Sequence, residues 1–208
     1  MKYFNIFILS LLFLTISACE KDKEKLTHAK PYQVVNEYEI TLNNDSRVAN
    51  LWFITSDASD FDEFAQTAIL AAMDLHKQYN SYDLIHVLLV PDKDLVATGS
   101  YYASAFYAVD KKGLKHVSGA DQQTMTNFKW LVRATENSLT QKELEITKLW
   151  YKHMADFPSE DMLSSLSYNE EKLVIFVADS LNLNIEEVVV PQFLYLDYKE
   201  LHFFYYLT

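Results

Sequence analysis

The fold of this 208-residue chain is decided by residues 51–109, which read LWFITSDASDFDEFAQTAILAAMDLHKQYNSYDLIHVLLVPDKDLVATGSYYASAFYAV. The stretch opens with Leu51–Thr55, a short apolar run rich in strand-forming residues. The polar cluster at 56–60 ends this run, because Ser and Asp side chains bond to nearby backbone groups. We therefore predict a strand that stops near Ser56 and a helix that is capped by Asp60.

An amphipathic helix is predicted to follow, ending near Tyr79. Asp60 and Glu63 stand at the spacing of a capping box, with Asp in place of the usual Ser or Thr. Apolar residues then recur with the helical period for about five turns, and the alanines among them let the helix lie close to a sheet. They are Phe61, Phe64, Ala65, Ala68, Ile69, Ala72, Leu75 and Tyr79.

Two more strands are predicted after this helix. Residues 84–90 form an almost unbroken apolar run closed by Pro91, which is typical of a strand covered on both faces. A strand, a helix and a parallel strand form a crossover unit, which is right-handed in nearly all proteins. The aromatic run 101–109 is predicted as the next strand, and residues 110–113 as a hairpin turn.

The sheet is expected to extend on both sides of this unit. Residues 32–42 alternate between apolar and polar side chains, so we expect a hairpin with residues 48–55. The turn of that hairpin is expected at residues 43–46, where Asn, Asp and Ser cluster. Residues 114–117 and 125–134 are predicted as further strands, the second of them as the last strand of the sheet.

From Ser138 onward the pattern changes to helices. Thr140 and Glu143 form a capping box for a helix that is expected to run to about Asp156. A short helix is expected at residues 158–161, where a proline precedes Ser, Glu and Asp.

A last helix is predicted from an Asn169 cap to about Leu181. Residues 173–177 alone fit a buried strand equally well, and the cap favours the helix. For the aromatic tail at 193–207 we predict no secondary structure. The tail carries too much apolar area for a free end, so it either docks on its own domain or forms a contact surface for a partner.

Together these elements predict an α+β fold. A mixed sheet of about five or six strands is covered by one long amphipathic helix and is followed by a small C-terminal helical segment. Residues 1–18 are predicted as a lipoprotein signal peptide and residues 19–31 as a mobile charged tether. The sheet domain is expected to span 32–136, and the helical segment with its aromatic tail 137–208.

The N-terminus carries the features of an export signal. Lys2 precedes the apolar run at 4–16, which is too short to span a membrane as a helix. The residues Ile16-Ser17-Ala18-Cys19 resemble the lipobox of bacterial lipoproteins. This resemblance implies that Cys19 is diacylated and becomes the first residue of the mature chain. The alternative is an ordinary signal peptide that happens to contain a cysteine.

The residue after the cysteine bears on the destination of the protein. In enterobacteria, Asp at that position retains a lipoprotein at the inner membrane, and this chain has Glu20 instead. We therefore expect a lipid-anchored protein of the cell envelope, on the periplasmic face of the outer membrane.

Charge and cysteine content narrow the possible functions. The chain has 18 Lys and Arg residues against 29 Asp and Glu, a formal net charge of −11 at pH 7. This acidity argues against nucleic acid as a partner, because the phosphate backbone is bound by basic surfaces. Cys19 is the only cysteine, so an acylated chain has no thiol for disulfides or catalysis. No cofactor is predicted.

A metal site is one interpretation of the acidic residues between the first strand and the helix. Asp57, Asp60 and Asp62 are the candidates, because carboxylates are ligands for hard cations. The junction resembles the Asp-x-Ser-x-Ser metal motif of von Willebrand A-type domains but has Phe61 where the second Ser is required. The alternative interpretation is a well-capped helix N-terminus.

Other chemistry-bearing residues are scattered. None of the six histidines has metal-ligand spacing to another, and His86 lies inside an apolar strand, as a core histidine would. The aromatic run 101–107 fits either a ligand platform or ordinary core packing. We predict contact with an envelope protein or a small ligand. The alternative is an envelope enzyme, a metal-assisted hydrolase built around Asp57, Asp60 and His86.

The chain also resembles an uncharacterised bacterial domain family, known only as a domain of unknown function. The likeness covers about residues 34–190 and includes a helix with Leu149-Trp150. It implies no activity, so it assigns no functional residue. The runs that carry it are Phe64–Ala68, Ala72–Leu75, His86–Leu89 and Tyr102–Asp110.

Overall fold

The computed structural model describes residues 26–42, 47–79, 82, 84–108, 130–159 and 168–198. Several predictions fall outside these residues, and the structure does not bear on them. They concern the signal peptide with Cys19, the tether up to residue 25, the turns at 43–46 and 110–113, the strand at 114–117, residues 125–129 of the next strand, residues 160–161 of the short helix and residues 199–207 of the tail. The prediction of the short helix is wrong for its described residues, because Pro158 forms an isolated antiparallel bridge with Tyr168 instead.

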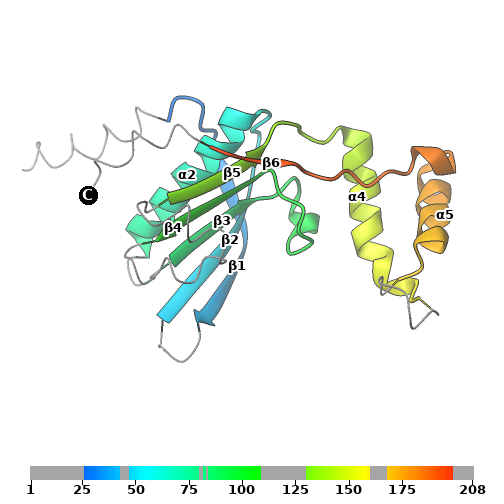
Figure 1. The fold of residues 1–208 in the computed structure, drawn as a ribbon, viewed down its shortest axis with the longest axis horizontal. Helices are drawn as coiled ribbons and strands as arrows, with labels where there is room; N and C mark the ends of the chain where they lie inside the picture. Colours follow the sequence, from blue (N-terminus) through cyan, green and yellow to red (C-terminus); the bar gives the residue numbers. More distant parts are fainter. Residues whose placement is uncertain are drawn as a thin grey trace, which may run out of the picture.

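A six-stranded mixed sheet forms the centre of the fold, with the strands in sequence order from β1 to β6 (Figure 1). The β2–β3 pair is parallel and the other four pairs are antiparallel, which confirms the predicted hairpin, crossover and mixed sheet. The strands are β1 (Tyr32–Leu42), β2 (Arg47–Ser56), β3 (Leu84–Leu89), β4 (Ala103–Ala108), β5 (Trp130–Thr135) and β6 (Tyr195–Asp197).

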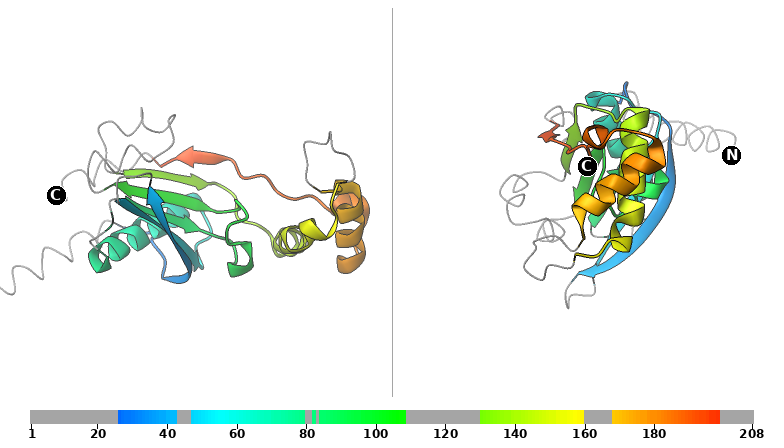
Figure 2. Two further views of the ribbon diagram at one scale, coloured as in Figure 1. Left: turned by 90° about the horizontal axis from the view of Figure 1, so that it is seen from below. Right: turned by 90° about the vertical axis from the view of Figure 1, so that its right-hand side faces the viewer.

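One long helix, α2 (Phe61–Gln78), packs across one face of this sheet (Figures 1 and 2). Its alanines let the helix axis approach closely: Ala68 and Ala72 are fully buried. Alternate residues of the strands face α2, and Ile54 and Val87 belong to the same hydrophobic core as the two alanines. The predicted amphipathic helix and its packing on the sheet are confirmed.

The start of α2 departs in one detail from a capping box. As predicted, the Asp60 side chain caps the helix by accepting a hydrogen bond from the Glu63 backbone N–H at 2.9 Å. The Glu63 carboxylate does not return to the Asp60 backbone. It accepts hydrogen bonds from the backbone N–H and the hydroxyl of Ser59 instead, at 2.9 and 3.1 Å. The backbone N–H groups of Ser59 and Glu63 at the start of α2 therefore both have hydrogen-bond acceptors within the chain.

The helical segment has a hydrophobic core of its own. It contains α4 (Gln141–His153), the 3-10 turn η3 (Met154–Asp156), α5 (Glu170–Leu181) and the 3-10 turn η4 (Ile185–Glu187). The buried residues that form this core are Ile146, Trp150, Leu173, Val177, Ala178 and Val188. In Figure 1 these helices stand beside the sheet, beyond one end of its strands. Within the described residues, no helix is both long and apolar enough to cross a membrane.

Both predicted caps in this segment are confirmed. Thr140 and Glu143 form the reciprocal capping box, and the Asn169 side chain accepts a hydrogen bond from the Lys172 backbone. Residues 173–177 are helical, so the strand alternative for them is wrong. Asn182 ends α5 in the left-handed conformation, with φ of 53°, where asparagine is among the tolerated residues.

Ion pairs and a hydrogen bond join α4 and the residues just before it to the sheet domain. The Lys148 ammonium lies 3.3 Å from Asp92 and 3.1 Å from Asp94, next to the 3-10 turn η1 (Lys93–Leu95) after β3. The Leu139 backbone N–H donates to the Tyr102 hydroxyl at 3.0 Å. α4 is thus held at the edge of the sheet where β3 ends and β4 begins.

Residues 26–31, which were predicted to belong to a mobile tether, are held against α2. Leu26 is buried in the sheet core. The His28 and Lys30 backbone N–H groups donate to the side chains of Gln66 and Thr67, each at 2.9 Å. The prediction of a mobile segment is wrong for these residues. The backbone N–H groups of the segment find hydrogen-bond acceptors in the buried polar side chains of α2.

The prediction that residues 125–134 form the last strand is also wrong. β5 is followed, after the whole helical segment, by β6, which pairs antiparallel with it and forms the sheet edge. β6 is only three residues long, and so short a strand carries no alternation that a pattern can detect.

Candidate functional site

The acidic residues that were candidates for metal binding serve other roles or stand apart. Asp60 caps α2, and Glu63 is paired with the Lys30 ammonium at 2.7 Å. The hydrogen bond from Lys30 lowers the pKa of Glu63 below its usual value, with further help from Ser59. Asp57 and Asp62 are at least partly exposed on either side of this junction. Among the described residues, no three His, Cys, Asp or Glu side chains come together as a metal site would require.

His86 lies away from these carboxylates. In the parallel β2–β3 register it stands opposite Leu51, six residues before Asp57, which places it roughly 20 Å away along the strand. Its imidazole stacks on Phe106 with ring centroids 3.7 Å apart, and its Nε2 lies 2.9 Å from the Ser104 hydroxyl. Burial lowers the pKa of His86 to about 3, so the ring is neutral at physiological pH.

The aromatic run at 101–107 is mainly core. Ala103 and Ala105 face α2, while Ser104 and Phe106 lie on the other face, as the alternation predicts. Tyr102 departs from the alternation because it precedes β4. Its ring turns under α2 and stacks on Phe64 at a centroid distance of 4.5 Å.

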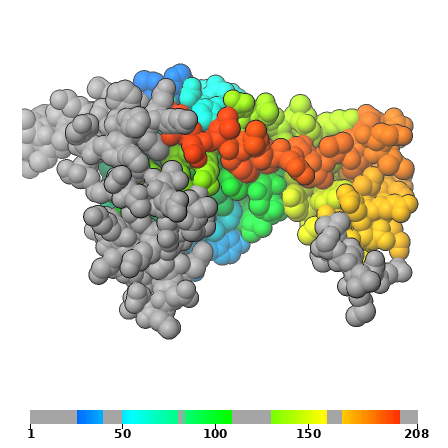
Figure 3. Space-filling view, viewed as in Figure 1, coloured from blue at the N-terminus to red at the C-terminus, as the bar shows by residue number. Residues whose placement is uncertain are grey.

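The most distinctive surface of the described chain is formed by residues 185–198, which we name the C-terminal strap. The strap begins with η4, continues along the molecule as an extended segment and reaches β6 at the sheet edge (Figure 2). In the space-filling view it forms a continuous ridge along one side (Figure 3). It therefore connects the two hydrophobic cores.

One set of side chains fastens the strap to the body. Val188 is buried in the helical core, and Tyr198 is only 4% exposed in the sheet core. The Tyr198 hydroxyl accepts a hydrogen bond from the Gln66 amide of α2 at 3.0 Å. Tyr195 stacks on Tyr101 at 4.3 Å, and its hydroxyl donates to the Tyr101 carbonyl oxygen at 3.0 Å. Burial raises the pKa of the Tyr195 hydroxyl above its usual range, so it remains a donor.

A second set of strap side chains points into solvent. Val189 is 62% exposed and Leu194 is 74% exposed, values that are unusual for large aliphatic residues. Ile185 and Leu196 are exposed as well, at 54% and 38%. These four aliphatic side chains are spread along the strap, and exposed apolar surface of this kind is a feature of many interaction sites.

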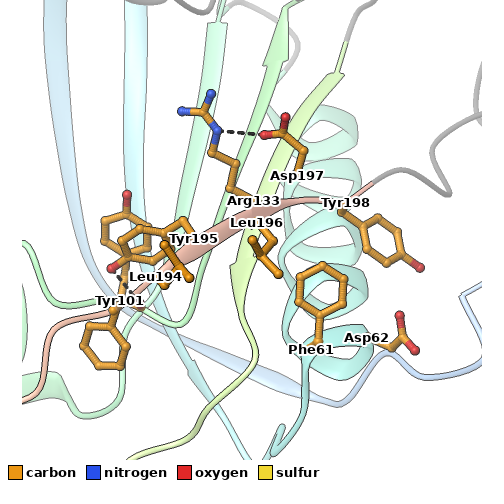
Figure 4. Close-up of a pocket in the computed structure, with 10 residues that line it drawn as sticks. Phe61, Asp62, Tyr101, Arg133, Leu194, Tyr195, Leu196, Asp197 and Tyr198 are labelled. Carbon is orange, nitrogen blue, oxygen red and sulfur yellow. Dashed lines mark hydrogen bonds and ion pairs between the residues drawn. The ribbon is translucent and has the colours of Figure 1, made fainter.

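A hollow of about 960 Å³ lies between the strap and the N-terminus of α2 (Figure 4). Leu196 and Tyr198 lie on the same side of β6 as Phe61, while Arg133 and Asp197 form an ion pair at 3.0 Å on the other side. Phe193, Leu194 and Asp62 also line the hollow. It is therefore a mainly apolar and aromatic groove with charged groups at its rim.

The backbone of β6 adds to this site. Tyr198 donates its backbone N–H to the Val132 carbonyl of β5 at 2.9 Å. Because strand residues alternate in their bonding direction, the backbone groups of Tyr195 and Asp197 point to the outer edge of the sheet. Within the described residues β6 has β5 as its one strand neighbour, so this edge offers donors and acceptors beside the groove.

Comparison with known proteins places the chain in a family. The sequence model described as "Domain of unknown function (DUF4875)" matches residues 27–194. The chain belongs to the DUF4875 family. This match begins where the chain docks on α2 and spans both the sheet and the helices α4 and α5, so the DUF4875 domain includes both parts. The resemblance to a domain of unknown function that we noted in the sequence is confirmed.

The DUF4875 fold also occurs in a solved structure. The chain is similar to a crystal structure of a DUF487 family protein from Desulfovibrio piger ATCC 29098, with a TM-score of 0.62 and 20% sequence identity. The alignment covers 83% of this chain and 97% of the other. At this identity the likeness concerns the fold alone. No curated protein matches the chain.

The strap was missed as a site in the sequence because its parts look unrelated there. The sequence singled out the aromatic tail as either docked or a contact surface. The structure of this DUF4875 protein describes residues 193–198 of the tail, where Phe193 and Tyr198 dock on the sheet core while Leu194 and Leu196 are exposed. The contact surface stays a prediction. Which side chains of the strap are docked and which are exposed depends on which of them reach the hydrophobic cores. A sequence pattern does not show this.

Proposed function

We propose that this protein is a lipid-anchored protein of the cell envelope that acts by contact with another envelope protein through the C-terminal strap. The observation that carries the contact role is the row of exposed aliphatic side chains at Ile185, Val189, Leu194 and Leu196. The strap is fastened to both cores, so a partner would meet a pre-ordered surface and lose little binding free energy to ordering it.

The lipid anchor is proposed from the sequence. Ile16-Ser17-Ala18-Cys19 has the order of a lipobox, and Glu20 favours the periplasmic face of the outer membrane. An anchored protein meets its partners in two dimensions beside the membrane, where a modest contact surface is enough because the local concentration is high.

The rival proposal, a metal-assisted hydrolase built around Asp57, Asp60 and His86, has less support. Asp60 is used as a helix cap, and His86 lies far along the sheet from both carboxylates. The neutral, stacked imidazole of His86 also suits a structural role.

The contact role is tested by placing charge on the strap. Val189→Asp with Leu194→Asp is expected to remove one or more proteins that cross-link to the wild-type chain in envelope extracts. The free energy of unfolding should change by less than about 0.5 kcal/mol, because both side chains are exposed. Val34→Asp, an exposed aliphatic residue on β1, is the matched control and should keep the cross-links. Identical cross-linked proteins for the strap variant and the wild type would contradict the proposal.

The anchor is tested separately at Cys19. Cys19→Ser is expected to abolish incorporation of radiolabelled palmitate and to leave uncleaved precursor or protein released from the membrane, because acylation needs the thiol. The wild-type protein should fractionate with outer membranes in a density gradient. Unchanged palmitate labelling of the Cys19→Ser protein would rule out the anchor without affecting the strap proposal.

A further inference from the structure

A second hollow lies on the face of the sheet that is turned away from α2. Leu51, Phe53 and Leu88 form its floor, since they alternate with strand residues that face the helix. The segment after β3 closes one side of it, and Tyr38 of β1 closes the other. Its volume is about 320 Å³, within the 300–1,000 Å³ of small-molecule sites. We call it the sheet-face pocket.

The wall formed by the segment after β3 is fixed in place. Leu95 is fully buried, and its backbone N–H donates a hydrogen bond to the Asp92 carbonyl oxygen at 3.0 Å. The Thr98 hydroxyl donates to the Leu95 carbonyl at 2.8 Å and accepts from the Ser100 backbone N–H at 3.3 Å. Lys148 of α4 holds Asp92 from outside. This wall of the pocket is therefore fixed by contacts within the protein.

This wall includes unusual backbone conformations. Ala97 has φ of 62° and Gly99 has φ of 87°, both in the left-handed region. For alanine this conformation costs on the order of 1 kcal/mol, and such strain is concentrated at binding sites. The two turns fold the chain so that Leu95, Gly99 and Ser100 all line the pocket.

The lining defines the chemistry of a ligand. None of the ten residues that line the pocket is charged: Tyr38, Leu51, Phe53, Leu88, Val90, Leu95, Ala97, Gly99, Ser100 and Tyr101. An ionised ligand would lose its hydration there without gaining a partner. The Tyr38 ring meets Phe53 edge to face at 5.7 Å, and its hydroxyl accepts from the Asn36 amide at 3.1 Å, which leaves its own hydrogen to donate. Ser100 also lines the pocket, and a serine hydroxyl can donate a hydrogen bond.

We propose that the sheet-face pocket binds a small neutral molecule that has an apolar or aromatic body and one oxygen acceptor, such as an ester or a ketone. The body lies on Leu51, Phe53 and Leu88, and its oxygen accepts a hydrogen bond from the Ser100 or Tyr38 hydroxyl. The site is separate from the exposed aliphatic row of the strap, so this proposal does not depend on the contact role.

Three probes of similar size test the proposal: methyl benzoate, toluene and benzoate. They are titrated into the full chain with Cys19→Ser, with leucine and valine methyl groups labelled for NMR. Methyl benzoate is expected to shift the methyl signals of Leu51, Leu88 and Val90 saturably. Toluene should bind more weakly, and benzoate about tenfold more weakly or worse, because its charge would be buried unpaired. Equal binding of benzoate and methyl benzoate, or no saturable shift with any probe, overturns the proposal.

Two variants locate the binding. Ser100→Ala combined with Tyr38→Phe removes both donor hydroxyls and is expected to weaken the binding of methyl benzoate by about two- to tenfold. The same change should leave the binding of toluene unchanged, since only the ester accepts a hydrogen bond. Leu51→Trp fills part of the cavity and should weaken both neutral probes by at least about tenfold. Val34→Trp, on the same hairpin but outside the lining, is the control. Probe binding that survives Leu51→Trp unchanged would place the ligand elsewhere and overturn the assignment.

Discussion

The chain with Ala68→Asp is expected not to hold its fold. Ala68 is fully buried between α2 and the sheet, and no basic residue is among the core residues around it. Placing a carboxylate there costs several kcal/mol for desolvation, even if the group is protonated. That is comparable with the roughly 5–15 kcal/mol of a whole domain. Circular dichroism should show lost cooperativity, and the protein should become insoluble.

Two companion variants distinguish burial from a general effect of the substitution. Gln78→Asp places the same residue at an exposed position of α2 and should cost less than about 1 kcal/mol, mainly through the helix dipole. Ala68→Val keeps the site apolar but overpacks it, so a folded protein that is about 1–3 kcal/mol less stable is expected. A cooperative melt of the Ala68→Asp protein at the wild-type temperature would contradict the close packing of α2 on the sheet.

Deleting residues 192–208 is expected to lower the stability of the remaining chain by about 3–5 kcal/mol, the range for removing a large buried aromatic side chain. The deletion removes β6, the buried Tyr198 ring and Phe193, which packs against the sheet core. It also leaves the Gln66 amide without its acceptor. Urea unfolding should show a lower midpoint than the intact chain.

Point variants within the strap separate docking from exposure. Tyr198→Phe keeps the ring but removes the acceptor for Gln66, which should cost about 1–3 kcal/mol. Leu194→Ala lies four residues away and should change stability by less than about 0.5 kcal/mol, because the side chain is already in solvent. An unchanged unfolding midpoint after the deletion would mean that the strap does not stabilise the body.

The parts of the fold that the sequence predicted are those with a local cause. The α2 stripe, the Asp60 cap, the Thr140–Glu143 box and the Asn169 cap each depend on residues three or four positions apart. Helix periodicity and capping are local, so they can be read without knowing the tertiary structure.

The parts that were missed depend on distant partners. β6 exists because Tyr198 and Phe193 reach cores that are made by other segments. Residues 26–31 are ordered by Gln66 and Thr67, which are more than thirty positions away. The sheet-face pocket likewise needs Tyr38 and Ser100 to meet across three strands. The same limit applies to the candidate sites, since neither the strap row nor the pocket has a sequence motif.

The position of the strap in the sequence also sets the order in which the strands of the sheet can assemble. β5 leads into α4 and α5, and only after them does the chain return as β6. A chain that emerges N-terminus first therefore presents β1 to β5 before the strand that pairs with β5 has arrived. Until then β5 is a bare edge and Tyr102 lacks the Phe193 ring that packs against it. Unpaired edges promote association between chains, so the interval before the strap arrives is when this protein is most prone to aggregate.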